Sequence, residues 1–185
     1  MAETPSKMRE LGFIAPDFTL PDTLSGKPLS LQELRSDQAT VIMFICNHCP
    51  FVKHVNDELV RLANDYIPKG ISFIAISSND AESYPEDSPE KMAEYGKRLG
   101  YPFPYLYDET QEVARKYDAA CTPDFFIFDR ELKCVYRGQL DDSRPSNGKP
   151  VTGKDIRNAL DAFLSGRPVN PDQKPGIGCN IKWKN

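Results

Sequence analysis

The chain has 185 residues, with 23 basic against 27 acidic side chains and a formal net charge of −4. This balance argues against a general nucleic-acid surface, and a hydrophobic content of 39% predicts one domain with a sizeable core rather than disorder. The longest apolar run, residues 41–45, is far too short to cross a bilayer. The polar residues 1–10 do not resemble a secretory signal, so we expect a cytoplasmic protein.

The first half of the chain predicts a strand–helix–strand unit. Residues 13–31 contain three prolines among short apolar pieces, which indicates an irregular hairpin and loop, and residues 31–35 allow one helical turn. The unbroken apolar pattern of residues 38–45 is typical of a strand buried on both faces. Apolar residues at helical spacing predict a helix over 49–67, and residues 71–77 predict a second strand. Because one helix connects the two strands, they should run parallel.

The second half predicts shorter elements. Residues 79–90 form an expected acidic loop, and helices are expected over 89–99 and 110–117. Two strands, 125–128 and 134–136, are joined by a short polar turn and should form a hairpin. The order of these elements predicts an α/β fold with a mixed central sheet flanked by helices on both faces.

The end of the chain divides into a helix and a tail. Apolar residues from Ile156 to Leu164 recur at helical spacing. After them, residues 166–185 are rich in proline and glycine, and we expect an irregular tail that packs on a domain formed by residues 1–165. An N-terminal extension precedes the first strand of that domain.

The feature with the clearest chemical meaning is Cys46-Asn47-His48-Cys49, which follows the first buried strand directly. Two intervening residues let both sulfurs meet within one helical turn, and the positive end of the helix dipole favours a thiolate. Cys46, expected to be the more exposed, should attack a disulfide, and Cys49 should resolve the mixed disulfide. His48 should tune the potential of the pair. The preceding strand offers no buried carboxylate.

Other interpretations of the two thiols stay open. They could be two buried cysteines that act as small apolar residues. A metal site would require further ligands to converge on the pair, and the candidates are Cys121, Cys134, Cys179 and His54. We predict no metal and no cofactor.

Several stretches of the chain resemble one known family. They are Ala15-Pro16-Asp17-Phe18, the segment from Phe44 to His54, the segment from Cys121 to Asp129, the segment from Gly138 to Asp142, and Gly178 to Trp183. Together they resemble the thioredoxin-like superfamily, specifically its redoxin (AhpC/TSA-like) branch of peroxiredoxin-like and thiol-disulfide oxidoreductase-like proteins.

The resemblance implies a thioredoxin-like fold, a redox-active disulfide at Cys46 and Cys49, and a cis peptide bond between Thr122 and Pro123 that packs against the dithiol and helps to dock substrate. Spacing alone would leave that proline as the edge of a strand, in the trans form. The chain departs from peroxiredoxins aligned on Cys49, because Cys46 occupies the position of their peroxide-binding threonine.

The sequence also allows predictions for the remaining cysteines, for His54 and for the acidic loop. Cys121 is expected to be a semi-buried spectator or else a third redox thiol, and Cys134 a core residue. Cys179, in the tail, either packs or folds back as a resolving thiol. His54 should be a partly solvated polar residue. The acidic side chains of loop 79–90 should form a solvated face.

Three functions are compatible with these residues and with the resemblance. The first is a thiol-disulfide oxidoreductase that uses Cys46 and Cys49 on a protein or small-molecule disulfide, with recycling by a thioredoxin-type reductant. The second is a peroxiredoxin-like antioxidant peroxidase in which Cys49 reacts with a hydroperoxide and Cys46 or Cys179 resolves it. The third is a metal-binding or redox-sensing module without turnover. We expect neither nucleic acid nor a membrane as a partner.

Overall fold

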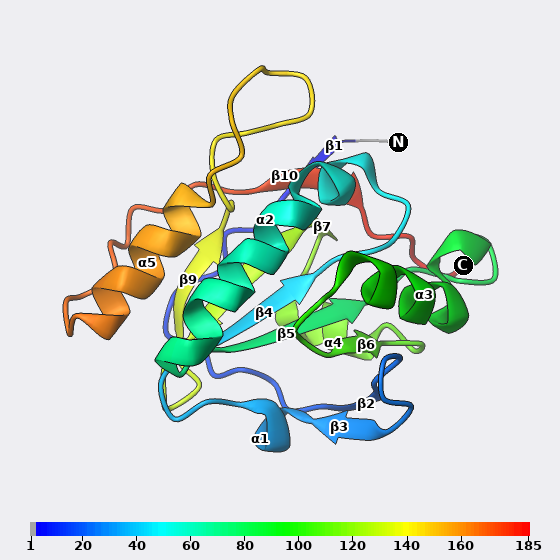
Figure 1. Cartoon of the computed structure of the whole chain (residues 1–185), viewed down its shortest axis with the longest axis horizontal. Coiled ribbons are helices and arrows are strands. Elements are labelled where there is room, and N and C mark those ends of the chain that lie inside the picture. The colour runs from blue at the N-terminus through cyan, green and yellow to red at the C-terminus, as the bar shows by residue number, and fades with distance from the viewer. Residues whose placement is uncertain (1–2) are drawn as a thin grey trace.

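The computed structural model of the chain describes residues 3–185 and is built around one five-stranded mixed sheet (Figure 1). The strand order is β6-β5-β4-β8-β9, in which β4, β5 and β6 run parallel and β8 and β9 run antiparallel to their neighbours. The strands span Tyr105–Tyr107 (β6), Ser72–Ser77 (β5), Thr40–Phe44 (β4), Asp124–Phe128 (β8) and Cys134–Gly138 (β9). The expected mixed sheet is confirmed, and β6 adds one strand that the sequence pattern did not indicate.

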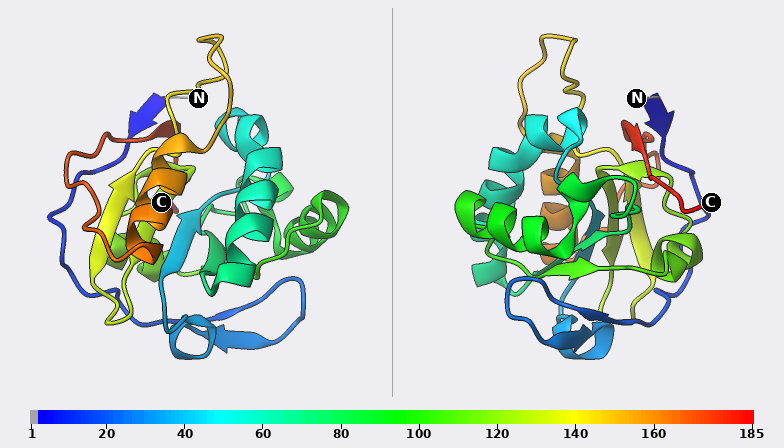
Figure 2. Two further views of the ribbon diagram at one scale, coloured as in Figure 1. Left: turned by 60° about the vertical axis from the view of Figure 1, so that its left-hand side comes forward. Right: turned by 90° about the vertical axis from the view of Figure 1, so that its right-hand side faces the viewer.

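Helices cover both faces of this sheet, as expected (Figures 1 and 2). On one face α2, α3 and α5 pack over strand residues such as Val41 and Met43; on the other, α4 and the N-terminal segment pack over Ile42 and Phe44. Alternate side chains of β4 therefore enter two separate cores, which explains its unbroken apolar sequence. The helices span Pro50–Tyr66 (α2), Pro89–Leu99 (α3), Glu112–Tyr117 (α4) and Lys154–Leu164 (α5).

Local signals fix where these helices begin and end. Ser88 caps α3 by accepting a hydrogen bond from the backbone N–H of Lys91, and Gly100 ends it in the left-handed region at φ 70°. Pro50 occupies the first turn of α2, where a missing N–H costs nothing. Two short 3-10 helices, η1 (Ile67–Lys69) and η2 (Pro85–Asp87), follow α2 and precede α3.

The N-terminal segment forms the expected hairpin and helical turn. Strands β2 (Thr19–Pro21) and β3 (Pro28–Ser30) pair antiparallel, and α1 (Leu31–Leu34) follows with a capping box between Ser30 and Glu33. Among residues 3–185, no helix combines the length and the apolar character that a membrane crossing requires.

The tail differs from the irregular segment that we expected. Residues Ile177–Asn180 form strand β10, which lies between β1 (Glu3–Pro5) and β7 (Cys121–Thr122) in a separate three-stranded antiparallel sheet. The sequence expectation was wrong here because the partners of this four-residue strand lie at the start and in the middle of the chain. Both chain ends are therefore brought to the edge where the cysteine motif lies.

Candidate functional site

The two cysteines of the motif lie where the prediction placed them, between β4 and α2, but their exposure differs from the prediction. Cys49 is the N-cap residue of α2, so it is the sulfur nearest to the helix dipole. Cys46 was expected to be the more exposed thiol, and instead it is 1% exposed. This expectation failed because Cys46 packs against Thr122 of β7 and beside Asp87, which belong to segments distant from it in the sequence.

A disulfide joins Cys49 to Cys179 of strand β10, across a sequence separation of 130 residues. Cys46 is a free thiol. Of the roles considered for Cys179, the structure therefore shows the one in which the tail folds back onto the motif, and it pairs Cys49 with Cys179 rather than with Cys46.

Both motif sulfurs meet the same residue, Thr122. The Sγ atom of Cys46 lies 3.5 Å from the Thr122 hydroxyl oxygen, and the Sγ atom of Cys49 lies 3.4 Å from the Thr122 carbonyl oxygen. Since a disulfide sulfur carries no proton, the second contact becomes a hydrogen bond only when Cys49 is reduced. The Thr122–Pro123 peptide bond is cis, as the family resemblance implied.

A buried carboxylate lies beside the motif, although none was expected from the strand. Asp87 is fully buried, and it accepts hydrogen bonds from the backbone N–H groups of Asn47, at 2.8 Å, and His48, at 3.3 Å. Its second oxygen accepts a bond from Asn79 at 2.9 Å and makes a short contact with Nδ1 of His48. Tyr84 stacks on the imidazole, with ring centroids 5.5 Å apart.

This cluster corrects our interpretation of loop 79–90. Glu82, Glu86 and Glu90 are exposed as predicted, but Asp80 and Asp87 are buried. The loop follows β5, so the rule that loops at the carboxyl ends of parallel strands gather at one edge could have placed Asp87 near the motif. Its hydrogen bonds come from two separate segments, residues 47–48 and Asn79, and no local pattern reveals that they converge.

The charges at the site oppose a thiolate at Cys46 while the tail is in place. Burial, and then the negative charge of Asp87, raise the pKa of Cys46 to about 12. Burial alone would raise the pKa of Asp87 as well, but hydrogen bonds from His48 and Asn79 lower it below its usual range. Asp87 is therefore ionised at neutral pH and Cys46 is a protonated thiol.

Comparison with protein families gives a match over most of the chain. Residues 11–137, more than half of the chain, match the AhpC/TSA family. The chain belongs to the AhpC/TSA family. No curated protein matches it.

Several solved structures are similar to this AhpC/TSA protein over most of its length. An uncharacterized conserved protein from Geobacillus kaustophilus is 70% identical, with a TM-score of 0.98 over 100% of this chain and 97% of the other. A hypothetical protein from Sinorhizobium meliloti 1021 is 49% identical, with a TM-score of 0.95 over 98% of each chain. The thioredoxin domain of a thiol-disulfide oxidoreductase from Bacteroides vulgatus is 19% identical, with a TM-score of 0.66 over 85% of this chain and 99% of that domain. The last similarity shows a shared thioredoxin-like fold.

The remaining predicted residues of this AhpC/TSA protein lie in different places. Cys134 is buried in β9, as predicted. Cys121 is fully rather than partly buried, and its sulfur lies 3.9 Å from the hydroxyl of Ser6. His54 is half-buried, and its Nε2 atom contacts the hydroxyl of Ser143 at 2.7 Å. None of these three joins the disulfide.

The structure does not assemble the metal ligands that we considered. Within residues 3–185, one group of three side chains, Cys46, His48 and Asp87, has its ligand atoms within 4.8 Å of one another. Only Cys46 belongs to the set considered from the sequence. The group offers sulfur, nitrogen and oxygen donors of the kind that zinc accepts.

Asp124 is expected to make the stability of this fold depend on pH. Burial raises the pKa of Asp124 to about 6, although hydrogen bonds from Ser6 and the backbone of Ala120 oppose the rise. The folded chain then binds a proton that the unfolded chain releases near pH 3.8, so stability should fall as pH rises from about 4 to 6 and stay level above. The loss should be on the order of 2–3 kcal/mol.

Unfolding in urea between pH 4 and 8 checks this, comparing the wild type with Asp124→Asn. The difference in unfolding free energy between the two should shift in favour of the variant as pH rises. Asp37→Asn, at an exposed carboxylate, is the matched control. Parallel stability curves for the wild type and Asp124→Asn would contradict the assignment.

Proposed function

We propose that this protein is a thiol-disulfide oxidoreductase in which Cys46 and Cys49 form the working dithiol. The observation that carries the proposal is that both sulfurs contact Thr122, beside the cis bond to Pro123, at the junction of a parallel strand and a helix. Both sulfurs therefore lie beside the backbone segment that precedes the cis proline. Protein or small-molecule disulfides are the proposed substrates.

The Cys49–Cys179 disulfide provides an entry to the cycle by thiol exchange. The Cys46 thiol gives up its proton and its thiolate attacks Sγ of Cys49, so that a Cys46–Cys49 bond forms and the bond to Cys179 breaks. The released Cys179 thiolate takes up a proton, and no net oxidation or reduction occurs. A thioredoxin-type dithiol then reduces the Cys46–Cys49 bond by two electrons and is itself oxidised to a disulfide.

The reduced pair can then act on a substrate disulfide. Cys46 attacks one substrate sulfur and expels the other as a thiolate, and Cys49 attacks Cys46 of the mixed disulfide, which releases the second substrate thiol. His48, held by the ionised Asp87, is the group proposed to tune the potential. About 30 mV corresponds to 1.4 kcal/mol for this couple, so a modest electrostatic change decides between reductant and oxidant.

A peroxidase is the second candidate, and the disulfide itself favours it. In that reaction the Cys49 thiolate attacks a hydroperoxide, forming sulfenic acid and an alcohol, and the Cys179 thiol condenses with the sulfenic acid to give the disulfide and water. The bond seen between Cys49 and Cys179 is the product that this sequence of steps requires.

Stopped-flow reduction and reoxidation, with insulin and a hydroperoxide side by side, separates the two candidates. For an oxidoreductase, Cys46→Ser should lose insulin reduction by at least about a hundredfold, and Cys179→Ser should keep it. For a peroxidase, Cys46→Ser should keep peroxide turnover and Cys179→Ser should lose it. Stoichiometric metal in the purified protein, with neither activity, would support the metal-binding alternative.

A cytoplasmic location fits the proposed activity. Besides the disulfide, the chain holds three free thiols in its described part, Cys46, Cys121 and Cys134. A reducing compartment keeps such thiols reduced and supplies the dithiol donor that the cycle needs. Cell fractionation with an antibody to the protein tests this location.

A further inference from the structure

The tail strand β10 lies on the backbone segment that precedes the cis proline. It pairs antiparallel with β7, with Cys179 opposite Thr122 and Asn180 opposite Cys121. The next residue continues the pairing, because the backbone N–H of Ile181 donates to the carbonyl of Ala120 at 3.2 Å. A strand added to a short exposed edge in this way is how many proteins bind an extended peptide.

Gly178 shows how closely this strand approaches the site. A Cβ atom built on Gly178 would lie 2.0 Å from the carbonyl oxygen of Thr122 and 3.2 Å from the nitrogen of Pro123. Its backbone does not adopt the left-handed conformation that would itself require glycine. Gly178 is therefore needed for space, and the position before Cys179 admits no side chain.

The residues after β10 contact the loops beside the motif through their backbone atoms. The backbone N–H of Lys182 donates to Asn79, at 2.9 Å, and its carbonyl accepts from the backbone of Asp80, at 2.8 Å, and from the Gln111 amide. Most of these contacts are made by main-chain atoms of the tail, as for a bound peptide whose sequence matters at few positions. They hold the tail against loop 79–90, which lies beside the motif.

We propose that β10 is a built-in substitute for a substrate segment, held at the site by the Cys49–Cys179 bond. When thiol exchange or a dithiol reductant frees Cys179, the strand leaves, and the Cys121–Thr122 edge takes an extended, cysteine-bearing segment of a partner protein. The inference rests on the proposed thiol-disulfide function and names its substrate class. The space at Gly178 adds a specificity: the residue before the substrate cysteine should be glycine.

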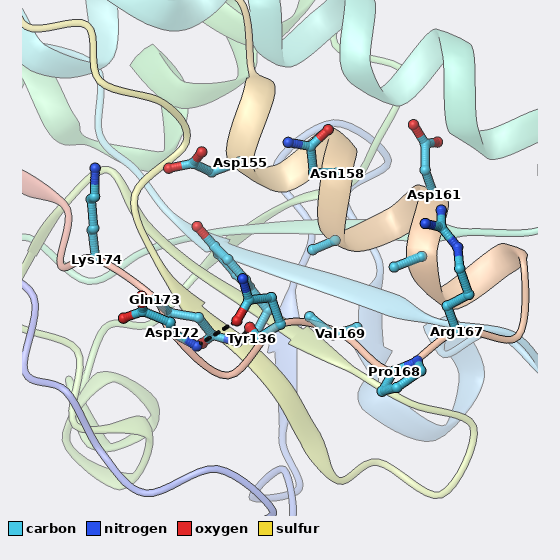
Figure 3. A pocket seen from close by; sticks show the side chains of 13 residues that line it. Tyr136, Asp155, Asn158, Asp161, Arg167, Pro168, Val169, Asp172, Gln173 and Lys174 are labelled. Atoms are coloured by element: carbon cyan, nitrogen blue, oxygen red, sulfur yellow. Dashed lines mark hydrogen bonds between the residues drawn. The ribbon is translucent and has the colours of Figure 1, made fainter.

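The segment that leads into β10 has a hollow beneath it. A pocket of about 430 Å³ lies between α5 and residues 167–174, and side chains from the helix and from this segment line its opposite sides (Figure 3). Gln173 fastens the segment to β9, donating to the carbonyl of Val135 at 3.0 Å and accepting from the N–H of Arg137 at 2.9 Å. Backbone bonds from Gln139 to Lys174 and from Ser6 to Gly176 also hold this segment, and the disulfide and the β10 pairing hold the strand itself.

Two substitutions in the tail test whether it covers Cys46. Gly178→Ala should displace β10, whereas Pro175→Ala, at an exposed position of the same tail, should not. The readout is the rate of Cys46 alkylation by iodoacetamide, located by mass spectrometry. Reduction of the wild type with dithiothreitol should raise the rate at least tenfold, and Gly178→Ala should show the raised rate without reductant. Equal protection of Cys46 in oxidised and reduced wild type would overturn the proposal.

A peptide probe tests the substrate class. A fluorescent peptide with the sequence of residues 175–182, its cysteine activated as a mixed disulfide, should be captured by the reduced Cys49→Ser variant, which lacks the resolving thiol, at least tenfold faster than the same peptide with alanine at its Gly178 position. Equal capture of the two peptides would overturn the specificity. Exchange with the small disulfide of 2-mercaptoethanol is measured in parallel. Absence of exchange with this disulfide would contradict the proposed function. Exchange with it, together with equal capture of the two peptides, would overturn only this inference.

Discussion

Cys49→Ser is expected to abolish reduction of both insulin and hydroperoxide, by about a thousandfold or more in turnover. Cys49 is the only cysteine required by both proposed reaction schemes: it resolves the mixed disulfide in one and attacks peroxide in the other. It is also the N-cap residue of α2, where the helix dipole favours its thiolate. Stopped-flow assays with both substrates measure the loss.

Cys134→Ala is the matched control for this experiment. Cys134 is also buried, but it lies in β9 and forms no disulfide. Its replacement should leave both turnover rates within about threefold of the wild type, even if stability falls by about 1 kcal/mol. Retention of a tenth or more of the activity by Cys49→Ser would show that another thiol carries the reaction.

Reduction of the Cys49–Cys179 bond is expected to lower the free energy of unfolding by about 3–5 kcal/mol. The bond spans 130 residues, and a cross-link over a loop of that length removes much of the entropy of the unfolded chain. Unfolding in guanidinium chloride with and without dithiothreitol measures the difference.

The variant Cys179→Ala separates this effect from a general action of the reductant. It should have the stability of the reduced wild type, within about 1 kcal/mol, because one buried side chain is truncated as well. Dithiothreitol should not change its unfolding midpoint. A wild type whose stability is the same in both oxidation states would show that the bond contributes nothing to folding.

Much of the central fold could be predicted because its signals are local. The apolar run that contains β4 needs both faces of a sheet covered, and Ser88 and Gly100 mark the two ends of α3 within a single segment. The short strands β6 and β10 gave no such signal. In β10, the glycine and asparagine weaken the strand pattern, and the strand exists because β1 and β7 lie on either side of it.

The sequence predicted which residue types form the candidate site, but it predicted less of how they are buried and paired. Spacing brought Cys46 and Cys49 to one strand–helix junction, and the structure places them there. The burial of Cys46 and the bond between Cys49 and Cys179 could not be predicted, because both depend on segments that are distant in the sequence. Asp87 was missed for a similar reason, since it accepts a hydrogen bond from the backbone of Asn47, 40 residues away.

The position of β10 between β1 and β7 also ties the oxidation state of one sulfur to the beginning of the chain. Residues Glu3–Pro5 are held by main-chain hydrogen bonds to β10, so whatever removes the strand also removes the partner of the N-terminal residues. Under the proposed release of β10, reduction of the bond at Cys49 is expected to free β1 and β10 together, so that a change of two electrons becomes a change in shape at the surface.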